Sequence, residues 1–121
     1  MKIATWNVRG FGTDNKKSMV KSIIREEKLD LIGLTETKHH EVTQWEMRKC
    51  WGNQCADWMH VTARQNFGGL ILTWRQEAFT HCNSFAMPRW LCVIGEIHET
   101  QVKYAFCLLY ATNSHHERMI V

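Results

Sequence analysis

Proline is almost missing from this sequence of 121 residues, which contains only Pro88. The sequence also lacks any Cys-x-x-Cys pair, any repeat or low-complexity tract, and any apolar run long enough to cross a membrane. These absences exclude a proline-rich linker, the commonest zinc-ribbon spacing and a helical membrane anchor. The length is enough for one small domain, and we expect it to have no membrane partner.

Excess charge of one sign is also slight. Lys and Arg together number 15 and Asp and Glu 12, which gives a net charge of +3 and an isoelectric point near 8.7. A mildly basic surface permits an anionic partner such as nucleic acid without requiring one. The six tryptophans can stack on bases or fill a core, and the core is their commoner role.

The five cysteines, an odd number, match no disulfide framework. A zinc site can be drawn from Cys50, Cys55 and His60, but their spacing matches no standard pattern. Reduced, mostly buried thiols are typical of the nucleus or cytoplasm, so we expect a nuclear or cytoplasmic protein.

The first third of the sequence predicts a strand, a helix and a second strand. Residues 2–6 favour extended structure, and residues 30–35 form an apolar run typical of a strand buried on both faces. Between them, a helix is predicted over 16–28, capped by Asp14 or Asn15. This order is typical of a βαβ unit with parallel strands.

The rest of the sequence predicts mainly strands. One short helix is expected within 39–51, and a capping box, Ser114 with Glu117, predicts another helix near the end. Strands are expected over 57–63, 69–74, 79–85, 89–97 and 102–110, with the last two forming a hairpin.

Polar side chains follow the two predicted parallel strands where each ends. Asn7 follows the first strand and Glu36 the second. A carboxylate at the carboxyl end of a buried strand is well placed to bind a metal, and an amide can orient a phosphate oxygen. Lys38 could meet a phosphate at the same edge. The alternative is that these are solvated loop side chains.

Tyr110 and Asn113 follow the last predicted strand and could both face one phosphate, although Asn is also a common turn residue. His115 and His116 are candidate acid–base groups, but adjacent residues of a helix do not share a face, so solvated side chains are the better interpretation.

Four blocks, TWNVRGFG, LIGLTETK, FGGLILTW and LLYATNSHHER, occur in an order that resembles the exonuclease–endonuclease–phosphatase superfamily. The sequence is most similar to the endonuclease domain of plant LINE-type (non-LTR) retrotransposons. The resemblance implies a four-layer α/β sandwich of DNase I type and Mg²⁺-dependent cleavage of DNA phosphodiesters.

The resemblance also implies roles for individual residues. Asn7 matches the asparagine that supports metal and phosphate, Glu36 the Mg²⁺-binding glutamate and Lys38 the lysine after it. Tyr110 and Asn113 match the residues that contact the scissile phosphate, so that Glu36, Tyr110 and Asn113 would be the catalytic residues.

The sequence departs from the family pattern in two single residues and two whole blocks. Thr35 replaces a glutamine and Thr112 a proline, whereas the Gly-Asp-x-Asn and Ser-Asp-His blocks are absent. Those blocks supply the residues that activate the attacking water. We therefore expect residues 1–121 to be the amino-terminal half of such a domain, of LINE origin, with weak or no cleavage alone.

The expected architecture of this half is one mixed β-sheet with flanking helices, with the second sheet absent and one apolar sheet face uncovered. Two alternatives remain open. The chain could be a non-catalytic interaction module that uses the uncovered face, or an active nuclease completed when two copies associate through it.

Overall fold

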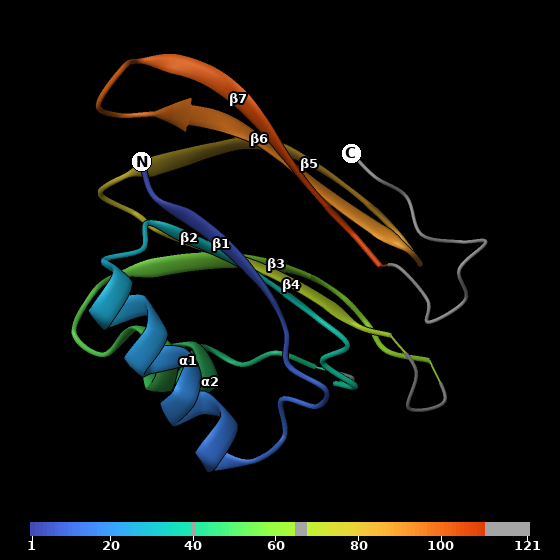
Figure 1. The fold of residues 1–121 in the computed structure, drawn as a ribbon. Helices are drawn as coiled ribbons and strands as arrows, with labels where there is room; N and C mark the ends of the chain where they lie inside the picture. The colour runs from blue at the N-terminus through green and yellow to red at the C-terminus, as the bar shows by residue number, and fades with distance from the viewer. Residues whose placement is uncertain (40, 65–67, 111–121) are drawn as a thin grey trace.

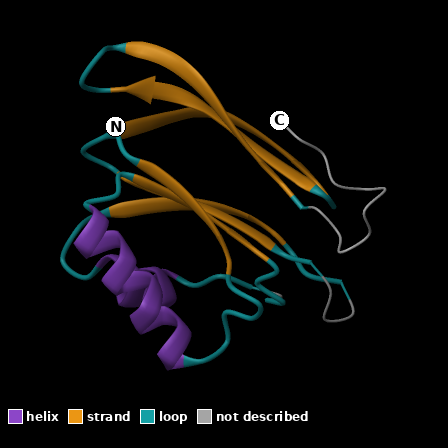
Figure 2. Cartoon of the chain, in the orientation of Figure 1, coloured by secondary structure: helices purple, strands orange, loops and turns teal. Residues whose placement is uncertain are grey.

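The computed structural model describes residues 1–39, 41–64 and 68–110. The described residues form three layers, in which two helices cover one face of a four-stranded sheet and a three-stranded sheet covers the other (Figures 1 and 2). The elements in chain order are β1 (Ile3–Asn7), α1 (Asp14–Glu27), β2 (Leu31–Thr35), α2 (Gln44–Trp51), β3 (Ala56–Val61), β4 (Leu70–Arg75), β5 (Phe79–Met87), β6 (Trp90–Ile97) and β7 (Val102–Leu109).

The predicted βαβ unit is confirmed, because β1 and β2 pair in parallel with α1 between them. Both predicted caps, Asp14 and Asn15, are wrong. Thr13 is the N-cap, because its side chain accepts a hydrogen bond from the backbone N–H of Lys16. Lys28 ends the helix in the left-handed region, where its N–H bonds to carbonyls of the last turn.

The four-stranded sheet has the order β1-β2-β4-β3, with β4 antiparallel to both of its neighbours. The central strand β2 is buried on both faces along almost its whole length, as its apolar run predicts. On the helix side, α1 and α2 bury a core around Phe11, Val20, Ile32 and Trp51.

A buried polar pair joins α2 to this sheet. The indole N–H of Trp51 donates to Thr73 Oγ1 at 3.0 Å, and that hydroxyl donates to the carbonyl of Asp57 at 2.7 Å. Thr73 is fully buried, so no water can replace its hydroxyl at the indole.

Replacing Thr73 by valine should therefore lower the free energy of unfolding by about 2 kcal/mol, because the buried indole N–H loses its acceptor. Urea denaturation measures this effect. Thr73→Ser keeps the hydroxyl and is expected to cost about 1 kcal/mol. Equal losses in both variants would contradict a role for the hydrogen bond.

Strands β5, β6 and β7 form a separate antiparallel sheet, in which β6 is central. The expectations of one mixed sheet and of a missing second sheet are therefore wrong. The alternating pattern predicts a strand but not its partner, and within the described residues these strands pair only with one another. Residues of both sheets, including Leu72, Trp74, Phe79, Leu91 and Val93, bury a shared core between them.

The outer face of the three-stranded sheet carries exposed apolar side chains. Phe85, Met87 and Trp90 are 49%, 51% and 36% exposed. Trp90 and Met87 are register partners on this face, opposite the side on which Leu91 enters the core. The apolar face predicted to be uncovered therefore belongs to a different sheet from the one expected.

Helices of the described part are too short or too polar to cross a membrane.

Candidate functional site

Asn7 and Glu36 lie at the same end of the four-stranded sheet. Asn7 is the register partner of Thr35, and Glu36 directly follows Thr35. Pairing continues past the strand ends, because the N–H of Val8 donates to Thr35 O at 3.0 Å and that of Gly10 to Glu36 O at 2.7 Å. Asn7 is exposed and Glu36 is half-buried, so a ligand can reach both side chains.

The side chain of Asn7 is oriented by its own backbone. Its Oδ1 accepts a hydrogen bond from the N–H of Arg9 at 3.2 Å, which forms the local turn typical of asparagine. Such an amide loses little further freedom when a ligand binds. The exposed guanidinium-bearing Arg9 lies in the same turn and adds positive charge at this edge.

The backbone around the two strand ends is unusual. Arg9, Glu36 and Lys38 have φ values of 50°, 52° and 54°, in the left-handed region that residues other than glycine rarely adopt. Each such residue costs on the order of 1 kcal/mol and persists only where the surrounding structure enforces it. Clusters of this kind are typical of ligand sites.

Two neighbouring segments enforce this conformation. The N–H of Phe11 donates to Thr37 O at 2.9 Å, while the N–H groups of Thr37 and Lys38 donate to Gly69 O at 3.2 Å and Gly68 O at 2.9 Å. Thr37 is only 1% exposed. Hydrogen bonds therefore hold the segment 36–38 on both sides. The backbone of Lys38 is fixed in this way, while its side chain is exposed to solvent.

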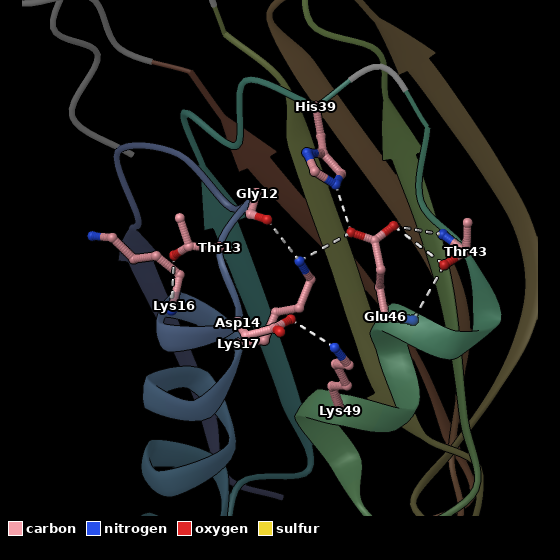
Figure 3. A network of polar contacts seen from close by, with 9 residues as sticks. All are labelled: Gly12, Thr13, Asp14, Lys16, Lys17, His39, Thr43, Glu46 and Lys49. Atoms are coloured by element: carbon pink, nitrogen blue, oxygen red, sulfur yellow. Dashed lines mark hydrogen bonds and ion pairs between the residues drawn. The ribbon is translucent and has the colours of Figure 1, made fainter.

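A network of polar contacts begins at His39, the residue that follows this segment (Figure 3). The carboxylate of Glu46 on α2 lies 2.5 Å from His39 Nε2 and 3.4 Å from Lys17 Nζ on α1. Lys17 also donates to Gly12 O at 3.3 Å. Lys17 and Glu46 are only 4% and 8% exposed, so this network ties both helices to the segment that carries Glu36 and Lys38.

Glu46 is charged in this setting despite its burial. Burial raises the pKa of its carboxyl. The opposing effect is larger: the pKa is lowered by hydrogen bonds from His39, the Thr43 backbone and Lys17, and by the charge of His39. The net pKa lies below the ordinary value of a glutamate.

Thr43 and Glu46 form a capping box at the start of α2. Their spacing of three residues in the sequence is a signal that could have predicted this capping box.

Tyr110 directly follows β7, the last strand of the other sheet. Its N–H donates to Arg89 O at 2.8 Å, and its side chain packs against the core between the sheets. Leu108 on β7 lies against Gly33 on β2, since a Cβ on that glycine would be 2.8 Å from Leu108 Cδ1. Both strands continue in the same direction beyond this contact (Figure 1). Tyr110 thus follows a strand that ends toward the same side of the molecule as β2.

Asn113, His115, His116 and the helix predicted from Ser114 lie outside the described residues. The pairing of β1 with β2 therefore places Asn7, Glu36 and Lys38 at one end of the four-stranded sheet, and Tyr110 lies on the neighbouring layer.

The residues of the site fit an open cation site better than a closed one. Over residues 1–39, 41–64 and 68–110, no three His, Cys, Asp or Glu side chains gather to hold a metal. Mg²⁺ does not need such a group, because it keeps several waters and uses one or two carboxylates together with phosphate oxygens of a ligand. Glu36 supplies one such carboxylate, and Asn7 supplies an amide at the end of the adjacent strand.

The expectation of mostly buried thiols is wrong. Cys50 and Cys92 are buried, whereas Cys55, Cys82 and Cys107 are exposed. Cys50 lies on α2 with its side chain in the helix-side core, which excludes it from a shared zinc site with the exposed Cys55.

No protein-family model matches this sequence, and no curated protein is similar enough to it to count as a relative. Solved structures with the same fold were found. An AP endonuclease of Leishmania major, LMAP, has a TM-score of 0.62 at 18% identity over 89% of this chain and 39% of its own. The catalytic domain of APE2 from Xenopus laevis has a TM-score of 0.60 at 16% identity over 98% of this chain and 47% of its own.

A functionally unknown protein of Enterococcus faecalis V583 has a TM-score of 0.65 at 16% identity, over 97% of this chain and 56% of its own. The chain thus spans less than two thirds of each of these proteins. Two sheets packed face to face with helices outside, in a chain that superposes on AP endonuclease domains, show that it has the DNase I-like α/β fold.

Proposed function

We propose that this chain is the amino-terminal half of a Mg²⁺-dependent DNA endonuclease domain of LINE-retrotransposon origin. In this proposal it binds a DNA phosphate at the ends of β1 and β2 and cleaves weakly or not at all alone. The observation that carries the proposal is that Asn7 and Glu36 lie at the ends of two paired strands, where Arg9, Glu36 and Lys38 have a constrained left-handed backbone. The nuclease-like fold and the partial coverage of its neighbours support it.

Each residue of the site has a separate task in this proposal. Glu36 would hold Mg²⁺, with the Asn7 amide orienting a phosphate oxygen beside it. When bound, the cation would neutralise charge on the phosphate. Lys38 would pair with a phosphate from the exposed side of the segment. Tyr110 and Asn113 would contact the scissile phosphate.

The proposed weak activity follows from the residues that the sequence lacks. Cleavage of a phosphodiester by water needs a positioned base as well as charge stabilisation. The Gly-Asp-x-Asn and Ser-Asp-His blocks do not occur in the sequence. The chain can bind phosphate without these blocks, because binding needs only the residues that hold the cation and contact the phosphate oxygens.

One observation favours a second candidate, a non-catalytic interaction module. The outer face of the β5-β6-β7 sheet exposes Phe85, Met87 and Trp90 together. Exposed apolar patches commonly mark protein-binding surfaces. Association of two copies through this face would also be the route by which a dimer could complete a nuclease.

DNA binding in Mg²⁺ and in EDTA, measured by fluorescence anisotropy at several salt concentrations, tests the proposal. We expect Mg²⁺ to strengthen binding severalfold and Glu36→Gln to remove that gain, because the variant loses the carboxylate that holds the cation. Affinity should fall steeply with salt. Glu26→Gln, which makes the same charge change on an exposed site of α1, is the matched control and should behave as the wild type.

Nicking of supercoiled plasmid and sedimentation velocity complete the experiment. Mg²⁺-dependent nicking that Glu36→Gln abolishes would show an active enzyme and overturn the proposed inactivity. An equal response of wild type and Glu36→Gln to Mg²⁺ would refute the assignment of Glu36. DNA binding that ignores Mg²⁺, with a mass that rises with protein concentration, would favour the interaction module.

A further inference from the structure

Two cysteines face each other across the hairpin of β6 and β7. Cys92 and Cys107 are register partners, and their sulfur atoms lie 2.8 Å apart. Directly opposed residues of antiparallel strands have Cα atoms about 4.5–5.5 Å apart. A disulfide requires roughly 4.4–6.8 Å between these atoms, so the backbone already has the spacing of a disulfide.

The two thiols differ in exposure. Both lie on the outer face of the sheet, since the alternating residues Leu91, Val93 and Leu108 enter the core between the sheets. Cys107 is exposed, whereas Cys92 is only 7% exposed. Burial, and then the neighbouring Cys107, raise the pKa of the Cys92 thiol to about 11. A reagent from solution therefore meets Cys107 first.

We propose that Cys92 and Cys107 form a reversible thiol–disulfide site, which exchanges with small-molecule disulfides such as oxidised glutathione. The thiolate of Cys107 attacks one sulfur of oxidised glutathione, whose S–S bond breaks and releases one glutathione thiolate. The Cys92 thiol gives its proton to solvent and attacks the sulfur of Cys107, which breaks the mixed disulfide and releases the second glutathione. The protein loses two thiol hydrogens, and one molecule of oxidised glutathione becomes two of reduced glutathione.

The fold determines which thiol reacts with the mixed disulfide on Cys107. Cys55 and Cys82 are also exposed, but Cys92 is the thiol that lies within contact of Cys107. A thiol held in position resolves a mixed disulfide far faster than one supplied from solution. The resulting disulfide would join β6 to β7 across a separation of 15 residues, just before the segment that carries Tyr110.

Peptide mapping tests the proposal on the full chain. The protein is incubated with mixtures of oxidised and reduced glutathione, quenched in acid, alkylated and digested with trypsin without reduction. Trypsin separates the cysteines, since Cys92 falls in peptide 90–103, Cys107 in 104–118 and Cys82 in 76–89. We expect 90–103 linked to 104–118 as the main product, and its reduction by excess reduced glutathione.

Further measurements test whether the folded strands are responsible for the link between Cys92 and Cys107. The same incubation in concentrated urea should give much less of this link, because the strands no longer hold the thiols together. The oxidised native protein should melt about 5 °C above the reduced one, because the crosslink limits the unfolded chain. Cys92→Ser should instead accumulate glutathione on Cys107, and Cys82→Ser should form the link as the wild type does.

A link that forms equally well in urea, or a wild-type protein that keeps glutathione on Cys107 without forming the link, would overturn the proposal. A Cys92→Ser variant that fails to fold, as judged by circular dichroism, does not affect this conclusion, because the comparison of native with urea-treated wild type decides it.

Discussion

Replacing Gly69 by alanine should lower the free energy of unfolding by about 3 kcal/mol and weaken Mg²⁺-dependent DNA binding. Gly69 has a φ of +89°, and a Cβ there would lie 2.3 Å from Thr37 Oγ1 and 3.1 Å from the backbone nitrogen of Lys38. Thr37 is buried, and the backbone nitrogen of Lys38 is hydrogen-bonded to Gly68 O at 2.9 Å. The added methyl group must therefore displace the segment that carries Glu36 and Lys38.

Gly68→Ala is the matched control for this prediction. Gly68 also has a positive φ, +67°, but a Cβ there would meet nothing within 4 Å. It should lose only about 1 kcal/mol, the cost of an unfavourable φ in alanine. Urea denaturation and anisotropy measure both variants. If both lose the same stability and affinity, close packing against Thr37 does not position the site.

The second large effect is expected for Glu46→Gln. At pH 7 this substitution should lower the free energy of unfolding by about 2 kcal/mol, because the buried Lys17 loses its counter-charge while the amide keeps the size of the carboxyl. Asp14→Asn, which breaks an exposed pair with Lys49, should leave the stability almost unchanged, because solvent screens this pair.

The loss of stability in Glu46→Gln should depend on pH in a direction that follows from the lowered pKa of Glu46. The pKa of Glu46 is lower in the folded chain than its ordinary value of 4.5, so the folded state favours the charged form. Its stabilisation is complete above the unfolded pKa and is lost as the pH falls through the folded pKa. The gap between wild type and Glu46→Gln should narrow below about pH 4.5 in urea titrations. A gap that stays constant down to pH 3 would show that the charge of Glu46 contributes nothing.

The order of the first elements could be predicted because each signal is local. The apolar run of β2 and the apolar stripe of α1 indicate a buried strand and an amphipathic helix without reference to the rest of the chain. The hairpin of β6 and β7 was predicted for the same reason. Sheet membership could not be predicted, because alternation in 79–109 is equally compatible with extending the first sheet or building a second.

The candidate site could be predicted in part. Asn7 and Glu36 were found because polar side chains end apolar runs, and parallel pairing then places them together. The left-handed backbone of Glu36 and Lys38 could not be found, since neither residue type signals a positive φ. The contact of Lys17 with Glu46 was also hidden, because charges this far apart in sequence meet only when both helices pack on the sheet.

The pairing of β1 with β2 allows only whole-residue changes in the relative position of Asn7 and Glu36. Ala4 and Trp6 of β1 pack on the helix-side core, whereas Ile3, Thr5 and Asn7 point to the opposite side. A slip of one residue would turn Asn7 into the helix layer and expose Trp6. The position of Asn7 relative to the end of β2 therefore cannot shift gradually when residues of β1 are substituted. Substitutions in β1 either preserve this position or abolish it, so the site behaves as a unit under mutation.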